Sequence, residues 1–246
     1  MESLTRHGRH LLGLTAALGM LITGCAHQPT APTPFGEVYE RAPDQGAAIE
    51  KSRVLLLEFT NFQCPFCRRS QDTMDELVDR YGDQLTVVTL HNPLLFHEYA
   101  GTLAKLAVVA QQEGKLQTIK RLLFEPYEAG ATEAKVQASL RMNDAEFKEV
   151  LSSPATAQRV EHHRRIANAV GLAGTPNFSI NGHVVKGAQP LEEFTKIIDS
   201  ELEAARDKGA IGGPWIKGRI KENAPDLHAY LFEGKTPPEV AGEKRF

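Results

Sequence analysis

The apolar and polar positions of the chain follow two different periods, and their order predicts strands that alternate with helices. The run Val54–Phe59 is almost continuously apolar, as is typical of a buried strand, and Leu85–Leu90 is predicted to be the next strand. Between them, an apolar stripe at helical spacing predicts a helix from about Cys64 to Tyr81, and Gly82-Asp83 is a stop signal for it. Because a single helix connects the two strands, we expect them to pair in parallel.

A long helical block and a hairpin follow. Residues 97–171 carry successive apolar stripes at helical spacing. The chain then returns to two short apolar runs, 177–180 and 183–186, on either side of Asn181-Gly182, and this dipeptide is the strongest short signal for a β-hairpin. A last amphipathic helix is expected from about Leu191.

The end of the chain, residues 207–246, is rich in glycine and proline. Trp215, the one tryptophan, is its only obvious apolar anchor. This pattern favours a surface strap or a partly disordered segment over a second domain.

Length and composition are those of an ordinary globular protein. The 246 residues suffice for one good-sized domain, or for a domain with an insertion. A hydrophobic content of 41 % and a charged content of 24 % are near average. The net charge of −3 is too small to indicate nucleic acid as a partner.

Residues 1–24 are expected to be a targeting segment. Arg6 and Arg9 precede an apolar stretch, Leu11 to Ile22, that is too short to span a bilayer. The stretch ends at Gly24-Cys25, and a small residue before a cysteine at this place resembles a bacterial lipoprotein signal. The resemblance implies cleavage before Cys25 and lipidation of that cysteine. The alternative is an ordinary secretory signal, with Cys25 as an unused thiol.

Either signal would export the chain to a compartment in which disulfides persist. Residues 25–50 would form a tether and an N-terminal arm, because the prolines at 29, 32 and 34 favour a semi-rigid spacer. Ala26 is not the aspartate that often marks retention at the inner membrane, so an outer-membrane destination is favoured.

Two cysteines three positions apart, Cys64 and Cys67, lie at the predicted junction between the first strand and the first helix. Pro65 fits the first turn of a helix, where a missing N–H costs nothing, and this places Cys64 at the helix N-terminus. The free N–H groups and the helix dipole there, together with the nearby Arg68, favour a thiolate on Cys64. Since Cys67 lies one turn later and can reach the Cys64 sulfur, the pattern indicates a redox dithiol.

A Cys-x-x-Cys pair is also half of a structural zinc site, and an inert disulfide is a further alternative. Zinc needs four ligands, and the chain has only one other cysteine, Cys25. His91 and His97 are available, but their spacing is not that of a ligand pair. We therefore favour the redox interpretation and assign no metal and no cofactor.

These motifs together resemble DsbA-like thiol–disulfide oxidoreductases, which have a thioredoxin fold with an inserted helical domain. The resemblance covers about residues 50–206. It rests on Glu58-Phe59 leading into Phe62–Cys67, on the motif from Asn92 to His97, on Gly174-Thr175-Pro176, and on the hairpin with its final helix. It implies an α/β fold with a thioredoxin-like domain at residues 51–93 and 172–206, a helical insertion at residues 94–171, and the tail after it.

The resemblance also implies roles for single residues. Cys64 matches the attacking thiol, Cys67 the resolving thiol and Pro176 the family's cis-proline, so that Thr175, Pro176, Pro65 and Phe66 would contact the substrate. The dipeptide Pro65-Phe66 departs from the strongly oxidising members, which have histidine where this chain has Phe66. A trans proline that merely begins an edge strand is the alternative at Pro176.

Glu58 is the one charged residue of the first apolar run. A carboxylate in a buried strand is costly unless it is paired or used. The functional interpretation is a proton acceptor beneath Cys67, which must ionise when it resolves a mixed disulfide. The alternative is a strand-end position with the side chain in water.

The sequence thus favours a lipid-anchored periplasmic enzyme that promotes disulfide formation in thiol-containing exported proteins and is recycled by a membrane redox partner. A reductase or isomerase running the same exchange from the reduced dithiol remains an alternative. A metal-binding lipoprotein that uses the same cysteines is the alternative from another class.

Overall fold

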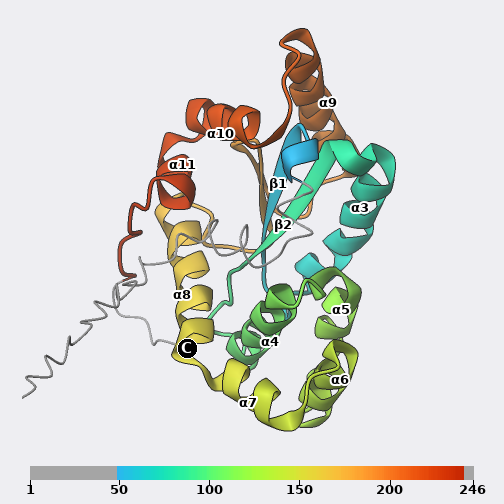
Figure 1. Ribbon diagram of the computed structural model, residues 1–246, viewed down its shortest axis with the longest axis vertical. Coiled ribbons are helices and arrows are strands. Elements are labelled where there is room, and N and C mark those ends of the chain that lie inside the picture. The colour runs from blue at the N-terminus through green and yellow to red at the C-terminus, as the bar shows by residue number, and fades with distance from the viewer. Residues whose placement is uncertain (1–48, 241–246) are drawn as a thin grey trace, which may run out of the picture. The chain divides into compact units, whose positions relative to one another are not determined.

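A computed structural model of the protein describes residues 49–240 (Figure 1). Four strands form one sheet: β1 (Val54–Thr60), β2 (Leu85–His91), β3 (Asn177–Ile180) and β4 (His183–Lys186). Their order across the sheet is β2-β1-β3-β4. The predicted parallel pairing of β1 with β2 is confirmed, and β3 runs antiparallel to both β1 and β4.

Helices cover both faces of the sheet. Successive side chains of β1 point to opposite faces, and because apolar side chains lie on both faces, each face must be covered. Val54 and Leu56 pack against α3 (Pro65–Tyr81) and α9 (Leu191–Asp207). Leu55, Leu57 and Phe59 pack on the other face, against α8 (Pro154–Ala169) and the helices at the end of the chain. All seven residues of β1 are therefore buried.

The helical insertion lies between β2 and β3 in the sequence. After the short 3-10 turn η1 (Gly82–Gln84) and strand β2 come α4 (Ala100–Gln112), α5 (Leu116–Leu123), α6 (Ala131–Leu140), α7 (Asp144–Ser152) and α8. Buried apolar side chains of α4 to α7 form a second core, to which residues of the turn between β1 and α3 also belong. The α/β fold of thioredoxin type with inserted helices is thus confirmed.

The end of the chain differs from the expected strap. It forms two helices, α10 (Gly212–Asn223) and α11 (Pro225–Phe232), which close the second face of the sheet. Their buried side chains are Ile216, Ile220, Leu227, Tyr230 and Leu231. Trp215 is only partly buried and is not the main anchor. The helices form because their prolines stand in first turns, where a missing N–H breaks no hydrogen bond.

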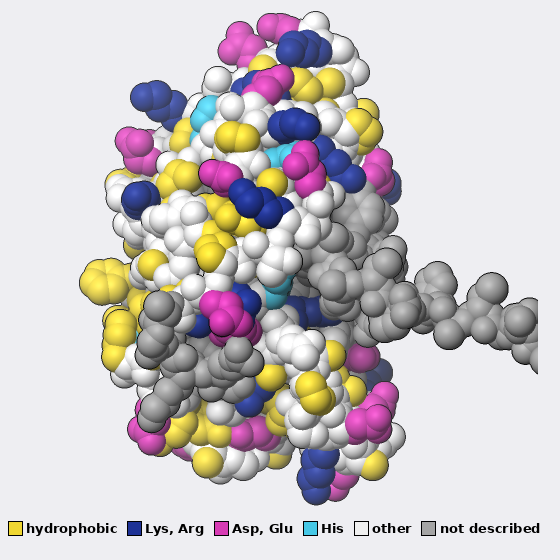
Figure 2. All heavy atoms as spheres, turned by 90° about the vertical axis from the view of Figure 1, so that its left-hand side faces the viewer, with side chains coloured by type: hydrophobic (Ala, Val, Ile, Leu, Met, Phe, Trp, Pro, Cys, Tyr) yellow, Lys and Arg dark blue, Asp and Glu magenta, His cyan; other side chains and the backbone are white. Residues whose placement is uncertain are grey.

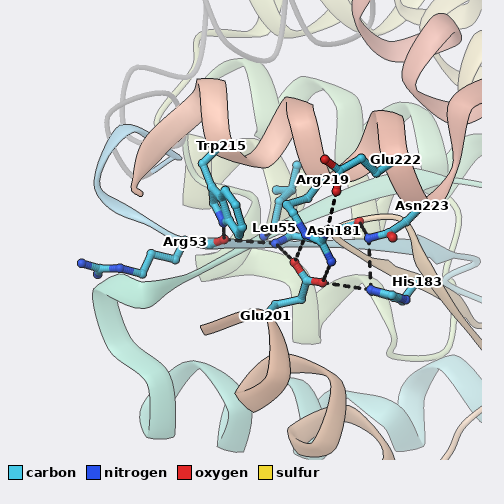
Figure 3. Close-up of polar contacts among 9 residues, drawn as sticks. All are labelled: Arg53, Leu55, Asn181, His183, Glu201, Trp215, Arg219, Glu222 and Asn223. Carbon is cyan, nitrogen blue, oxygen red and sulfur yellow. Dashed lines mark hydrogen bonds and ion pairs between the residues drawn. The ribbon is translucent and has the colours of Figure 1, made fainter. Parts of the chain in front are cut away.

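Polar contacts fix α10 to the hairpin and to α9 (Figure 3). The buried carboxylate of Glu201, on α9, accepts hydrogen bonds from Arg219 of α10, Asn181 of the hairpin turn and His183 of β4. Asn223 Nδ2 donates to the carbonyl of Asn181 over 2.9 Å.

The other end of α10 is fixed to the residue that precedes β1. The indole nitrogen of Trp215 lies 3.0 Å from the carbonyl oxygen of Arg53, to which it donates. Both ends of α10 are thus hydrogen-bonded to the sheet region.

On the face turned to the viewer in Figure 2, Lys and Arg side chains are interspersed with Asp and Glu. Within residues 49–240 no helix combines the length and the apolar character needed to cross a bilayer. The signal segment, Cys25 and most of the N-terminal arm lie outside the described residues. The boundaries of the proposed domains stay predictions.

Candidate active site

The two cysteines lie where strand β1 passes into helix α3. Cys64 is the N-cap of α3 and Pro65 is its first residue, as predicted. Asn61 shapes the turn before them, because its side-chain oxygen accepts from the N–H of Gln63 and its carbonyl from the N–H of Cys64, both over 3.0 Å. Asn61 Nδ2 lies 2.6 Å from Nδ1 of His97. The turn is therefore held by hydrogen bonds among its own residues and by the contact with His97, near the start of the insertion.

The environment makes the two sulfurs chemically unequal. Both cysteines are free and buried, with exposed fractions of 5 % for Cys64 and 0 % for Cys67. A hydrogen bond from the Cys67 thiol, which outweighs the opposing effect of burial, lowers the pKa of Cys64 to about 5, and the N–H groups of Phe66 and Cys67 add to it. Burial, with the hydrogen bond to Cys64, raises the pKa of the Cys67 thiol well above its ordinary value. Cys64 is thus the stabilised thiolate and Cys67 its proton-bearing neighbour.

The helix N-terminus contributes to the acidity of Cys64 as expected, but Arg68 is not among its causes. The larger contribution comes from Cys67. Sequence spacing brings the two residues together but does not show which sulfur donates.

A loop from the far end of the chain completes the site. The predicted cis peptide bond between Thr175 and Pro176 is confirmed. The carbonyl oxygen of Thr175 lies 3.5 Å from the Cys64 sulfur, which donates to it in the thiol form. Asn92 and Asn177 donate to the carbonyl groups of residues 172–174 and hold this loop in place.

Glu58 is fully buried in the centre of the sheet, which excludes the strand-end alternative. Its carboxylate pairs with the ammonium group of Lys120 on α5, and it accepts a hydrogen bond from Gln71 Nε2 over 2.8 Å. Gln71 Nε2 also donates to the carbonyl of Cys67 over 3.1 Å. Glu58 is thus linked to Cys67 through Gln71, and its role in proton transfer stays a prediction.

The insertion is part of the site. Phe62, Cys64 and Cys67 belong to the same hydrophobic cluster as the core of α4 to α7. The ring of Phe62 lies 4.9 Å from that of Phe124, between centroids. Gln63 Oε1 accepts from the N–H of Tyr99 over 2.6 Å. No local sequence pattern indicates these contacts or the role of Lys120, because the partners are distant in the chain.

Two open grooves flank the cysteine turn. The first, which we call the cis-proline groove, has a volume of about 620 Å³. Its lining is Phe66, Arg69, Ser70, Thr73, Thr175, Pro176 and residues 187–190. The second, the insertion groove, has about 230 Å³ and is lined by residues 62–65, Arg68 and residues 124–127, including Cys64 itself. Pro65, Phe66, Thr175 and Pro176, the predicted substrate contacts, therefore line one groove or the other.

Residues 49–240 contain no group of three or more His, Cys, Asp or Glu side chains arranged to hold a metal ion. The arrangement instead supplies one stabilised thiolate, one buried thiol and an open approach to the first. Those are the parts needed for thiol–disulfide exchange, in which a thiolate attacks or leaves a disulfide sulfur.

Comparison with known sequences gives one family model and several relatives. The model described as Thioredoxin matches residues 47–200. The Na(+)/H(+) antiporter NhaA of Herminiimonas arsenicoxydans is 26 % identical over 159 residues, which are 64 % of this chain and 25 % of the relative. NhaA 3 of Salinispora tropica is 26 % identical over 156 residues, 62 % of this chain and 24 % of the relative. The chain thus spans about a quarter of the length of the curated relatives it matches, and their antiporter names apply to the whole proteins.

Solved structures share the fold. A thioredoxin-like oxidoreductase from Silicibacter pomeroyi superposes with a TM-score of 0.54 at 22 % identity, over 65 % of this chain and 90 % of that one. The thiol-disulfide exchange protein alpha-DsbA2 from Wolbachia pipientis gives 0.54 at 15 % identity, over 70 % and 99 %. BdbD from Bacillus subtilis gives 0.54 at 20 % identity, over 63 % and 90 %. At these identities the likeness concerns the fold.

Proposed function

This chain belongs to the thioredoxin family, and from that premise we propose that it is a thiol–disulfide oxidoreductase that acts on exported proteins through Cys64 and Cys67. The observation that carries the proposal is the inequality of the two sulfurs. The pKa of Cys64 is lowered to about 5, whereas burial raises that of Cys67. Thiol–disulfide exchange needs this difference in pKa, because one cysteine attacks or leaves as a thiolate while the other resolves the mixed disulfide.

In the oxidised enzyme the two cysteines form a disulfide. A substrate thiolate attacks the Cys64 sulfur, a mixed disulfide forms, and Cys67 leaves as a thiolate that takes up a proton. A second substrate thiolate then attacks the substrate sulfur of the mixed disulfide and expels Cys64 as a thiolate. The substrate is oxidised by two electrons, and the enzyme disulfide becomes a dithiol. A redox partner in the membrane would restore the disulfide.

The cis-proline groove is the proposed place for the substrate chain. Thr175 lies at its edge, with its carbonyl next to the Cys64 sulfur. An extended substrate segment can pair with the backbone of this loop as an added strand pairs with a sheet edge. The exposed ring of Phe66 offers an apolar contact in the same groove.

The low pKa of Cys64 favours the oxidising direction, because a stabilised thiolate stabilises the reduced enzyme. Equilibration with glutathione buffers measures this directly. We expect a potential between about −120 mV and about −270 mV, on the oxidising side of the midpoint. A value near about −270 mV would indicate the reductase or isomerase alternative instead.

Trapping experiments test the exchange itself. Cys67→Ser should accumulate mixed disulfides when it is mixed with disulfide-linked peptides, because the Cys64 thiolate attacks one peptide sulfur and expels the other as a thiolate, and the resolving thiol is missing. Cys64→Ser should form none and should have no exchange activity. Mixed disulfides that form equally on both variants would contradict the assigned roles.

Glu58 is proposed to accept the proton of Cys67 when that thiol ionises to resolve a mixed disulfide. Glu58→Gln should slow exchange near neutral pH while the fold stays intact. Equal rates for variant and wild type from about pH 6 to about pH 8 would exclude this role.

We further propose that the chain is exported and held by lipid on Cys25, with the outer membrane as its destination. Two or more acyl chains are needed for a firm tether. Full-length protein should fractionate with membranes, and Cys25→Ser should release it to the soluble fraction. A wild-type protein found in the soluble fraction would contradict the anchor.

A further inference from the structure

Two arginines follow Cys67 directly and face opposite grooves. Arg69 lines the cis-proline groove and Arg68 the insertion groove. Within residues 49–240, neither arginine forms an ion pair with a carboxylate, whereas Arg121, Arg165 and Arg219 do. Each groove beside the cysteine turn therefore holds an arginine that is not paired with a carboxylate of the described residues.

The two grooves differ in their charge balance. The lining of the insertion groove holds charges of both signs, Arg68 and Glu125, and Glu125 also lies 4.0 Å from the ammonium group of Lys135. In the cis-proline groove Arg69 is the only charged residue of the described lining, and the other polar side chains are neutral, namely Ser70, Thr73, Thr175 and Gln189. This groove is therefore complementary to a negative charge.

The guanidinium of Arg69 is also held in place. Its Cζ atom lies over the ring of Phe66, 4.5 Å from the centroid. Such a contact restrains the side chain and occupies one face of the guanidinium. The N–H groups lie in the plane of the guanidinium and are suited to a carboxylate.

We infer that the cis-proline groove selects substrate segments with an acidic side chain close to the reacting cysteine, and that Arg69 is the residue that determines this preference. The inference rests on the proposed function and specifies its substrate class. A carboxylate in the groove pairs with Arg69 while the neighbouring backbone lies along Thr175. The attraction acts before the sulfurs react, so it raises the rate of productive association.

The experiment uses two reduced peptides that differ only by Glu or Gln next to the cysteine, with versions for each side. The second-order rate constant for their reaction with the oxidised protein is measured, and the ratio of the Glu to the Gln rate is taken. The acidic side chain also changes the intrinsic reactivity of the peptide thiol, but this effect cancels when the ratio is compared between protein variants.

We expect the Glu-to-Gln ratio to be about two- to fivefold higher for wild type than for Arg69→Gln, as for an exposed ion pair. Arg69→Lys should recover part of the preference because it keeps the charge. Arg68→Gln is the matched control and should keep the wild-type ratio. Salt at about 1 M should remove most of the wild-type preference, because it screens exposed charges.

An Arg69→Gln ratio equal to that of wild type would overturn the inference, and so would an equal loss in Arg68→Gln. Exchange that proceeds with both peptides at an unchanged ratio contradicts only the substrate class. Absence of exchange with every peptide would contradict the proposed function as well. Both arginines are exposed, so the variants are expected to fold, and circular dichroism verifies this.

Discussion

Arg219 of α10 holds the carboxylate of Glu201 on α9 with two nitrogens: Nε lies 2.9 Å from Oε2, and Nη2 lies 2.6 Å from Oε1. Although burial alone would raise it, the hydrogen bonds from Arg219, Asn181 and His183 hold the pKa of Glu201 below its ordinary value. The pair therefore stabilises the docked α10 at neutral pH. A carboxyl group with a lowered pKa contributes stability above its unfolded pKa, and this contribution is lost as the pH falls.

Glu201→Gln should lower the free energy of unfolding by about 3 kcal/mol at neutral pH, because Arg219 and His183 lose their shared carboxylate in a largely buried place. Urea unfolding measures the change. The matched control is Arg121→Gln, which removes an exposed pair with Asp72 and Asp75 and should cost at most about 1 kcal/mol. Equal losses in the two variants would contradict the structural importance of the Glu201 contact.

Gly182 should be intolerant of a side chain for two reasons. Its φ of +95° is unfavourable for other residues, and a Cβ there would lie 2.7 Å from the Cβ of Asn223 on α10. Gly182→Ala should lower the free energy of unfolding by about 1–3 kcal/mol, as overpacking does. Gly218→Ala, at a helical position with open space around it, should instead be neutral or stabilising by up to about 1 kcal/mol. Thermal unfolding of both variants distinguishes the two sites.

The acidity of Cys64 should depend on Cys67 more than on any other side chain. Cys67→Ala removes the donated hydrogen bond that most lowers the pKa of Cys64, so that pKa should rise from about 5 toward its ordinary value. Cys67→Ser keeps a donor and should raise the pKa of Cys64 less. Thiolate absorbance or alkylation rate against pH gives the values. In wild type the alkylation rate should be half-maximal near pH 5 and should level off about two pH units higher, and a midpoint above about pH 8 would contradict the activation.

Lys120 should be required for stability only when residue 58 is a glutamate. Lys120→Met leaves a fully buried carboxylate without its ammonium partner and should lower the free energy of unfolding by about 3–5 kcal/mol. In the double variant Glu58→Gln/Lys120→Met the loss should be much smaller than the sum of the two single losses. Additive losses in the double-mutant cycle would show that the pair is not coupled.

The buried histidines should make the fold sensitive to acid. Burial lowers the pKa of His91 to about 4 and that of His163 well below its ordinary value, while the N–H of His91 donates to Nδ1 of His163 over 3.2 Å. The unfolded chain binds these protons near the ordinary value of 6.5, so stability is lost as the pH falls below it. His91→Gln should reduce the loss between pH 7 and pH 5 by about 2 kcal/mol. A difference between variant and wild type that stays constant with pH would contradict this.

Local patterns were sufficient for the elements around the cysteines. The strand before Cys64, Pro65 in the first turn of α3, and the hairpin at Asn181-Gly182 all follow from preferences of a few neighbouring residues. The cis bond at Pro176 was expected from the resemblance rather than from such preferences, and it is present.

What the sequence did not reveal depends on contacts between distant positions. Lys120 is 62 residues from Glu58, and a lysine on an amphipathic helix carries no mark of a buried partner. Glycine and proline are typical of helix ends and loops, so their frequency in residues 207–246 does not indicate the final helices. The spacing of Ile216 with Ile220, and of Leu227 with Leu231, places each pair on one helix face and could have indicated them.

The dithiol shares its hydrophobic cluster with the helical insertion, and this has a thermodynamic consequence. The reduction potential measures how much more stable the fold is with two thiols than with a disulfide. A substitution in the insertion core can destabilise the reduced and the oxidised form by different amounts. Such a substitution must shift the reduction potential, even if the substituted residue touches neither sulfur. For a two-electron couple, about 1.4 kcal/mol of such a difference corresponds to about 30 mV. The insertion can thus adjust the oxidising strength of the protein over a scale of tens of millivolts while the Cys-Pro-Phe-Cys motif stays unchanged.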